Sequence, residues 1–254
     1  YHRYLGGSPT NLAMNVARLG LNSTIVATVG DDGFGEYIFN RLEGEGVRTN
    51  YVSTIANKPT SVIFVSRSES TPEFIPFREA DSIISESQIP TELLQRTRIF
   101  HTTSFALSKE PAQSTILKKA EEAFNIGCKL SIDYNYSSKI WSSKTKALEV
   151  IKTYCKFNPL VKISEDDMFR LFDAHLPHEE IFNFFHEEGV DTVCLTLGSK
   201  GVKLSQKEEA IIELPAIKIE KVMDSTGAGD AFWSGFLFAY TQKKSMRACL
   251  DVAL

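Results

Sequence analysis

Segments with the pattern of strands alternate with segments that have the pattern of helices along most of this chain of 254 residues. Short apolar runs of strand length are each followed by a longer run with helical periodicity. The strand-like runs are Ser23–Val29, Ile99–His101, Lys129–Asp133, Leu160–Ser164 and Thr192–Leu197, and the helix-like runs are Gly35–Gly44, Pro111–Asn125, Thr145–Lys156, Asp166–Phe172 and Pro177–Glu188. Because helices between strands favour parallel pairing, this order predicts an α/β fold with a parallel sheet between layers of helices.

Three short strand-like runs break the alternation, since no helix-like run separates them. Val52–Ile55, Ser61–Ser66 and Glu73–Phe77 are joined only by polar turns. Such a patch predicts a small antiparallel flap inserted in the α/β domain. Tyr1–Leu5 also has the pattern of an edge strand, and we expect it to join this flap.

The composition is that of an ordinary globular protein, with 43% apolar and 24% charged residues. It allows one sizeable core, and we treat residues 1–254 as a single domain. A net charge of −4 argues against a nucleic-acid partner, and the absence of a bilayer-length apolar stretch argues against a membrane partner. The cysteines stand singly, as reduced thiols usually do, so we expect a cytoplasmic protein; they are Cys128, Cys155, Cys194 and Cys249.

The run from Asp224 to Asp230 leads directly into an apolar helix-like segment. Gly227, Ala228 and Gly229 place no bulky side chain between the backbone and a ligand. The N–H groups at the start of the helix attract an anion, and Asp230 supplies a carboxylate beside it. Phosphoryl transfer to a hydroxyl group requires such an arrangement. A glycine-rich turn with Asp230 as a helix cap explains the same residues equally well.

A second glycine-containing segment predicts a helix with polar residues at its start. Ser8 is a candidate N-terminal cap, and Gly20 suits a left-handed end. Asn11 offers an amide in the first turn, just after Gly6 and Gly7, where it suits a polyhydroxylated ligand. An ordinary capped helix is the alternative.

Polar residues follow five of the strand-like runs, at the end of each run. They are Asp31–Gly33, Thr102–Ser104, Asp133–Asn135, Ser164–Asp167 and Thr196–Gly201. Ligands of open α/β sheets bind beyond the carboxyl ends of the strands, so these residues predict one site along this edge, with Asp230 at its centre. A dinucleotide oxidoreductase is disfavoured, because no Gly-x-Gly-x-x-Gly opens a helix after a strand.

The two glycine-containing segments resemble the two signatures of the PfkB, or ribokinase-like, carbohydrate kinase family. The first signature is matched by Gly6-Gly7-x-Pro9-x-Asn11-x-Ala13 with Gly20 and Gly30, and the second by Asp224–Leu237. Two long patterns in this order are far more specific than one glycine motif, and the resemblance covers essentially the whole chain. It implies a ribokinase-like, Rossmann-like three-layer fold with a small antiparallel β lid formed by about residues 1–7 and 50–78.

The resemblance also implies roles for single residues. It makes Asp230 the general base, with Gly227, Ala228 and Gly229 as the anion hole. It implies contacts to the sugar from Gly6, Gly7, Asn11, Arg78 and Asn135. It implies contacts to the phosphates of ATP from Thr196, Gly198, Gly201, Gly227 and Gly229. It places Mg²⁺, ordered through water, near Asp167, and a monovalent cation such as K⁺ near Asp224 and Thr226.

The activity implied by the resemblance is ATP-dependent phosphorylation of a primary hydroxyl of a small neutral sugar, with fructose as the first candidate. Ser137 stands where a family segment, Asp-x-Asn-x-Arg, has its arginine, and losing a cation disfavours an acidic sugar. The alternative substrates are 2-keto-3-deoxygluconate, ribose and a deoxy-ketogluconate. From another class, a catalytically inactive sugar- or nucleotide-binding module is the alternative, and the intact run Gly227–Asp230 argues against it.

Members of the family usually begin with another strand, which carries a sugar-binding aspartate, and end with a further helical segment beside the nucleotide. We therefore expect this chain to be incomplete at both ends. Lids in the family often pair between subunits, and a homodimer through the lid would use the apolar residues Val62, Phe64 and Phe74. Inward packing of these side chains is the alternative.

Overall fold

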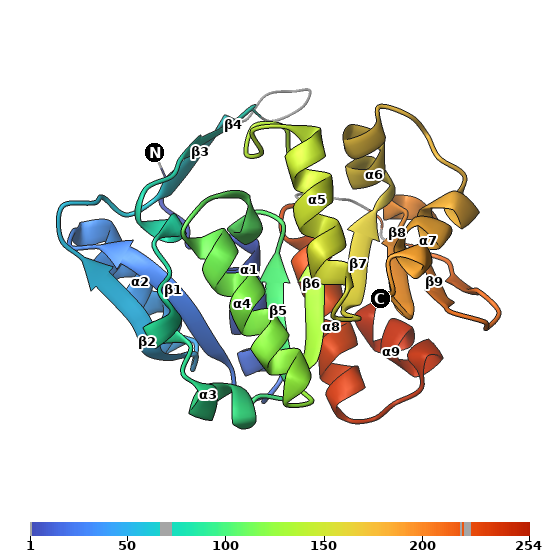
Figure 1. Cartoon of the computed structure of the whole chain (residues 1–254), viewed down its shortest axis with the longest axis horizontal. Helices are drawn as coiled ribbons and strands as arrows, with labels where there is room; N and C mark the ends of the chain where they lie inside the picture. Colours follow the sequence, from blue (N-terminus) through green and yellow to red (C-terminus); the bar gives the residue numbers. More distant parts are fainter. Residues whose placement is uncertain (1, 67–72, 219, 221–224) are drawn as a thin grey trace.

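The larger sheet consists of four parallel strands followed by two antiparallel ones, and it lies between two layers of helices (Figure 1). The computed structural model describes residues 2–66, 73–218, 220 and 225–254. The larger sheet has the order β10-β9-β8-β7-β6-β5. Its strands are β5 (Ile99–Thr103), β6 (Lys129–Asp133), β7 (Leu160–Ser164), β8 (Thr192–Thr196), β9 (Val202–Gln206) and β10 (Ile212–Leu214). β5 to β8 are parallel, whereas β9 and β10 are antiparallel at one edge.

Two groups of helices cover the opposite faces of this sheet. One group is α4 (Ala112–Asn125), α5 (Lys144–Cys155), α6 (Glu165–Phe172) and α7 (His178–Glu187), and the other is α1 (Ser8–Arg18), α8 (Ala228–Thr241) and α9 (Met246–Ala253). Ile116 and Phe185 share a buried cluster with Ile132 of β6 on the first face. Leu12 and Trp233 share the cluster on the second face. In the described ranges, no helix is both long and apolar enough to cross a membrane.

The alternation of strands and helices predicted from the sequence is confirmed, with boundaries shifted by a few residues at most for the segments from β5 to β8. The sheet is mixed because the segment after β8 turns back at once. Gly198–Lys200 forms a short 3₁₀ turn, η4, and β9 then pairs antiparallel with β8. A turn this short has no room for the crossover helix that a parallel pair needs.

A separate sheet consists of β1 (Thr24–Gly30) and β2 (Arg48–Ile55), which are parallel, with Ala27 opposite Val52. The helix α2 (Gly33–Gly44) carries the chain from the end of β1 back to the start of β2, which explains the parallel pairing. The expectation that Val52–Ile55 belongs to the antiparallel lid is therefore wrong. Residues 2–7 form no strand and lead directly into α1.

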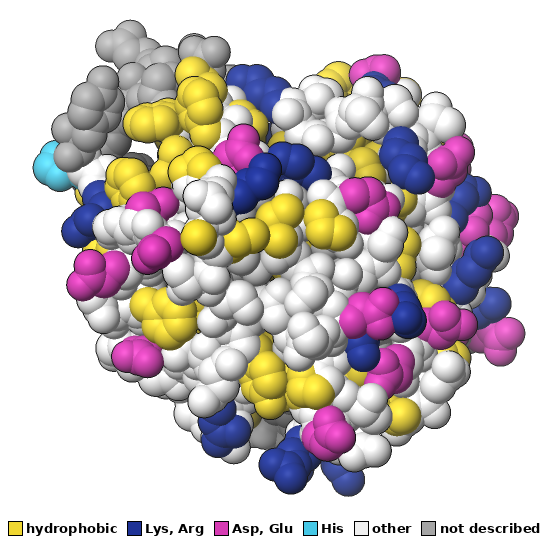
Figure 2. All heavy atoms as spheres, turned by 60° about the vertical axis from the view of Figure 1, so that its left-hand side comes forward, with side chains coloured by type: hydrophobic (Ala, Val, Ile, Leu, Met, Phe, Trp, Pro, Cys, Tyr) yellow, Lys and Arg dark blue, Asp and Glu magenta, His cyan; other side chains and the backbone are white. Residues whose placement is uncertain are grey.

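The antiparallel lid consists of β3 (Val62–Ser66) and β4 (Glu73–Phe77) in the described part of the chain. Its apolar residues remain largely exposed, and Figure 2 shows them as a group next to the grey segment. Phe64 is 49% exposed, Phe77 is 56% exposed, and their rings meet edge to face. The exposed surface also includes Ile63, Val65 and Ile75.

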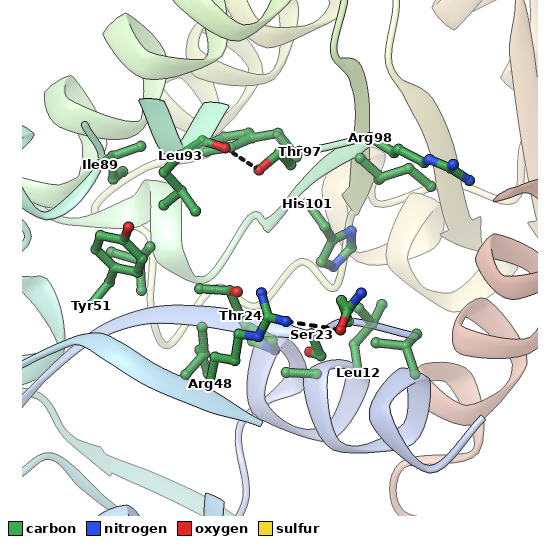
Figure 3. A pocket seen from close by; sticks show the side chains of 18 of the residues that line it. Leu12, Ser23, Thr24, Arg48, Tyr51, Ile89, Leu93, Thr97, Arg98 and His101 are labelled. Atoms are coloured by element: carbon green, nitrogen blue, oxygen red, sulfur yellow. Dashed lines mark hydrogen bonds between the residues drawn. The ribbon is translucent and has the colours of Figure 1, made fainter. Parts of the chain in front are cut away.

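A cleft of about 820 Å³ separates the two sheets (Figure 3). Residues 23–26 of β1 and its approach line one side, and residues 98–102 at β5 line the other. Within the part of the chain that the structure describes, no backbone hydrogen bonds join β1 to β5, so each is an edge strand there. In Figure 3, the ring of His101 points into this cleft. Its Nδ1 lies 3.0 Å from Ser131 Oγ, and its buried Nε2 has no hydrogen-bond partner.

Candidate active site

The first turn of α8 meets the first turn of α1 at the side chain of Asp230. Asp230 Oδ1 accepts a hydrogen bond of 2.6 Å from Ser8 Oγ, and Asp230 Oδ2 accepts one of 2.8 Å from Asn11 Nδ2. Both donors are more than two hundred positions away in the sequence. Asp230 as a whole is half-buried. The structure therefore brings together the predicted base and the predicted sugar-binding amide.

Ser8 does not cap α1, contrary to expectation. Gly7, with a φ of 96°, takes the capping position, and no side chain caps this end. Its carbonyl accepts the first helical hydrogen bond, from Asn11 N at 2.9 Å. Because Ser8 is already the first helical residue, its hydroxyl is turned toward Asp230 instead. Gly20 ends the helix with a φ of 88°, as predicted.

The turn before α8 uses the conformational freedom of glycine at one position. Gly227 has a φ of 78°, which other residues rarely adopt, and precedes the first helical residue. A Cβ there would lie 3.8 Å from Asn11 Nδ2 and 3.9 Å from Asp230 Oδ2, so this backbone forms a wall of the site. The N–H of Ala228 donates to Ser225 O at 3.1 Å and closes the turn. The predicted cation site cannot be described in full, since Asp224 lies outside the described residues, while Thr226 is exposed.

A buried ion pair lies beneath the first turn of α8. Lys162 of β7 is opposite Asp133 of β6, and its Nζ lies 2.9 and 3.0 Å from the two carboxylate oxygens. Both side chains are almost fully buried, at 7% and 3% exposure. A Cβ on Gly229 would stand only 2.9 Å from Lys162 Nζ, so the ammonium group lies directly against this turn.

Burial and neighbouring charges shift the pKa values of this pair. Burial raises the pKa of Asp133 to about 6, although the attraction of Lys162 opposes the rise. Burial by itself would lower the pKa of Lys162, but Asp133, Asp167 and Asp230 outweigh it and raise that pKa. Both groups are consequently charged at neutral pH. Lys162 is thus a fixed cation among three carboxylates.

Asp167, the residue that the resemblance places near Mg²⁺, is engaged within its own helix. Its Oδ2 accepts hydrogen bonds from the hydroxyl and the backbone N–H of Ser164, and Ser164 Oγ accepts one from Asp167 N at 3.0 Å. Its Oδ1 accepts one of 3.3 Å from Arg170. These contacts form a capping box at the start of α6. The described residues contain no cluster of three metal-binding side chains, so the structure shows no direct metal site here, and a contact from Asp167 to Mg²⁺ through water stays a prediction.

The predicted nucleotide-binding residues lie together on the turn between β8 and β9. Thr196 Oγ1 donates to Ile163 O at 3.4 Å, which ties the end of β8 to β7. Gly198 and Gly201 have positive φ values of 57° and 111°. Gly201 also passes very close to β10, since a Cβ there would lie 2.1 Å from Leu214 O. Packing alone therefore requires glycine at position 201.

Of the remaining predicted sugar contacts, Arg78 is tied to its own surroundings. Its Nη2 lies 2.7 Å from Asp81 Oδ2, its Nη1 donates to Ser108 Oγ, and its guanidinium group lies 4.0 Å from the centre of the Phe105 ring. Among the described residues, the buried Oδ1 of Asn135 has no hydrogen-bond partner, and neither has Nη2 of Arg78, whose contact with Asp81 is an ion pair only. Gly6 is exposed, and a Cβ placed on it would have no atom within 4 Å.

Lys162 was not among the residues predicted from the sequence. It stands within the apolar run Leu160–Ser164, and a charged residue in a buried strand is costly unless it is paired. Asp133, at the end of the preceding strand-like run, is a matching partner. That combination is the signal from which the pair could have been found.

A carboxylate held beside a glycine-rich helix N-terminus, at the edge of an α/β sheet, is an arrangement suited to phosphoryl transfer. Residues 1–254 match the family described as "pfkB family carbohydrate kinase", and the chain belongs to this family. It is an ATP-dependent sugar kinase.

Relatives and solved structures agree with this assignment. An ATP-dependent 6-phosphofructokinase of Thermoanaerobacterium thermosaccharolyticum is 37% identical, over 97% of this chain and 76% of the relative. Fructokinase-1 of Oryza sativa subsp. japonica is 31% identical, over 94% of this chain and 75% of the relative. The structure of Halothermothrix orenii fructokinase has a TM-score of 0.87 and 33% identity, and covers 100% of this chain and 87% of that one. Fructokinase from Vibrio cholerae O395, solved in a fructose-, ADP- and calcium-bound form, has a TM-score of 0.89 at 25% identity, covering 100% of this chain and 83% of that one.

Proposed function

We propose that this kinase transfers the γ-phosphoryl group of ATP to a primary hydroxyl of fructose, with Asp230 as the general base. The position of Asp230 carries the proposal: Ser8 and Asn11 hold both carboxylate oxygens, and the helix N-terminus beside them attracts the phosphoryl group. Asp230 accepts the proton of the sugar hydroxyl as the new O–P bond forms and the bond to ADP breaks.

The remaining binding roles belong to the same proposal. The amides of Gly227 and Gly229 receive the phosphoryl group, and the turn at Thr196, Gly198 and Gly201 faces the other phosphates. Gly6, Gly7, Asn11 and Asn135 contact the sugar, and the unpartnered Oδ1 of Asn135 supports its part. Arg78 acts in the sugar pocket only if fructose displaces its present partners.

Mg²⁺ enters with the nucleotide, as MgATP, and the ion supplies charge neutralisation on the phosphates. Asp167 would meet the ion through water in this proposal, while its carboxylate also holds the start of α6. K⁺ near Asp224 and Thr226 is a further part of the proposal, and replacing KCl by NaCl in the assay tests it. The kinase acts in the cytoplasm, which its buried, unpaired cysteines support.

Fructose 6-phosphate is a second candidate acceptor. The relative from T. thermosaccharolyticum is named an ATP-dependent 6-phosphofructokinase. Two lysines also lie close to the lid and Arg78: Lys109 Nζ donates to Arg78 O at 2.8 Å, and Lys139 Nζ donates to Phe74 O at 3.0 Å. Such cations suit a second phosphate.

A coupled assay of ADP release tests the proposal with fructose, fructose 6-phosphate, ribose and 2-keto-3-deoxygluconate. Highest kcat/KM with fructose is expected, and highest kcat/KM with fructose 6-phosphate would select the second candidate. Asp230→Asn should lower kcat by about 10²–10⁴-fold with the fold intact. Asp191→Asn, the same change at an exposed position just before β8 and at the opposite end of the strands, is the matched control. Near-normal turnover by D230N would overturn the role of Asp230.

A lid-mediated homodimer completes the proposal. The exposed apolar surface of β3 and β4 supports it, since Phe64 and Phe77 are both about half exposed in the single chain. A second lid would remove these rings from water. Val62 and Phe74, the other residues considered from the sequence, are only partly exposed.

A further inference from the structure

The Lys162–Asp133 pair occupies a place in the sheet where apolar side chains would otherwise pack. Lys162 lies between Val161 and Ile163 on β7, and both neighbours are buried. Its side chain is 7% exposed and ends between the two oxygens of Asp133. So little of the pair is exposed that water stabilises its charges only weakly.

Stability does not account for this pair. Removing two charges from water costs more than an apolar pair of similar volume, and replacing buried ion pairs by apolar residues is often neutral or stabilising. Leu160, two positions away and so on the same face of the strand as Lys162, is buried in an apolar cluster. A buried cation at this position therefore calls for an explanation from the site above it.

The position of the ammonium group supplies that explanation. It lies against the backbone of Gly229, where any larger residue would place its Cβ 2.9 Å from Nζ. Glycine at 229 thus makes room for the cation as well as for a ligand. The same ammonium group interacts electrostatically with the carboxylates of Asp133, Asp167 and Asp230. Without Lys162, the negative charges of these three carboxylates near the first turn of α8 would be opposed only by the partial charges of the helix end.

We propose that Lys162 is the buried cation of the phosphoryl site, and that Asp133 is a positioning residue that holds it beneath Gly229. The inference rests on the proposed kinase function of the same site. Lys162 offsets the charge that develops on the transferring group and on ADP as the bond to the leaving oxygen breaks. Its attachment to the sheet keeps the cation fixed, so no reorganisation is needed during the reaction.

The test compares variants that remove the cation with variants that keep it. Lys162→Met together with Asp133→Asn (K162M/D133N) leaves no unpaired buried charge, and Asp133→Asn alone keeps the ammonium group and a carbonyl acceptor. Lys129→Met is the matched control, since Lys129 is a largely buried lysine at the far end of β6, where it donates to Asn158 O at 2.7 Å. The measurements are kcat, KM for the sugar, and the affinity for ADP with aluminium fluoride, a mimic of the transferring phosphoryl group.

The proposal expects K162M/D133N to lose about 10²-fold in kcat and in affinity for ADP with aluminium fluoride, while KM for the sugar changes by less than about threefold. D133N should lose less than about tenfold, and K129M should behave like the wild type. A K162M/D133N protein that folds and retains a kcat within about threefold of the wild type would overturn the proposal. If that pair fails to fold by circular dichroism, Lys162→Gln with Asp133→Asn, which keeps a hydrogen bond, decides under the same criteria.

Failure of the proposed function would be visible separately. A wild-type protein that phosphorylates none of the sugars refutes the sugar-kinase proposal for fructose and its alternatives, whatever Lys162 does. Calorimetry with MgATP then still decides the role of Lys162. Binding weakened by about tenfold or more in K162M/D133N supports it, and unchanged binding overturns it.

Discussion

His101 should make the folded protein sensitive to acid. Burial lowers the pKa of His101 to about 3, and the nearby charge of Lys162 adds to the effect. An unfolded chain has a histidine pKa of about 6.5. The folded state therefore binds fewer protons than the unfolded state between these values, so stability is lost as the pH falls from about 6.5 toward 3.

The magnitude follows from the size of the shift. At pH 5 the unfolded histidine has gained its proton and the folded one has not, which costs about 2 kcal/mol relative to pH 7. Asp133 acts in the opposite direction, because its raised pKa lets the folded state gain a proton as the pH falls through about 6. The wild-type profile contains both contributions, and only a comparison with a His101 variant separates them.

His101→Asn removes the titrating ring and keeps a polar group next to Ser131. Urea unfolding of both proteins at pH 7 and pH 5 gives the assay. The advantage of the wild type over H101N should shrink by about 2 kcal/mol between the two pH values. His101→Phe, with different packing, should show the same change. A stability difference that is identical at pH 7 and pH 5 for both variants would refute the reasoning.

Three other predictions concern packing, thiols and the lid. Gly201→Ala should lower the free energy of unfolding in urea by about 2–5 kcal/mol, because Gly201 has a positive φ and lies against β10. Gly127→Ala, at a positive φ with open space around it, should lower it by only about 1–3 kcal/mol. Equal losses for the two variants would contradict this reasoning. All four thiols are buried and burial raises the pKa of Cys155 to about 12, so a thiol reagent at pH 8 should label the chain only after unfolding, and rapid labelling of the native protein would contradict it. Phe64→Ser with Phe77→Ser should convert a dimer to a monomer in light scattering without loss of fold, while a wild-type protein that is already monomeric would refute the lid contact.

The sequence was informative where a residue's role depends on its neighbours along the chain. The strands Lys129–Asp133 and Leu160–Ser164 have the predicted boundaries, because short apolar runs between helix-like runs leave little alternative. The meeting of Asn11 with Asp230 was expected only as part of one common site. Their hydrogen bond itself depends on the packing of α1 against α8, which no local pattern encodes.

The errors arose where tertiary pairing decides the outcome. The run Val52–Ile55 is equally suited to a lid or to a parallel sheet, and its position beside β1 is fixed by α2. Ser8 has the right chemistry for a cap, but the helix begins one residue earlier than that role requires. No local pattern predicts the ion pair of Lys162, because its partner Asp133 is distant in sequence and adjacent only in the folded sheet.

The cleft between β1 and β5 has a consequence for how the protein opens. In the described residues no ladder of backbone hydrogen bonds crosses the cleft, and the two sheets are linked by side-chain packing and by a few hydrogen bonds through residues 83–88. Cooperative units of local unfolding tend to follow such boundaries. Amide protons of β1 and β2 should then exchange with deuterium through an opening of lower free energy than those of β6 and β7, which lie inside a continuous ladder. The half of the molecule that carries Lys162 would thus remain ordered while the half next to the lid opens.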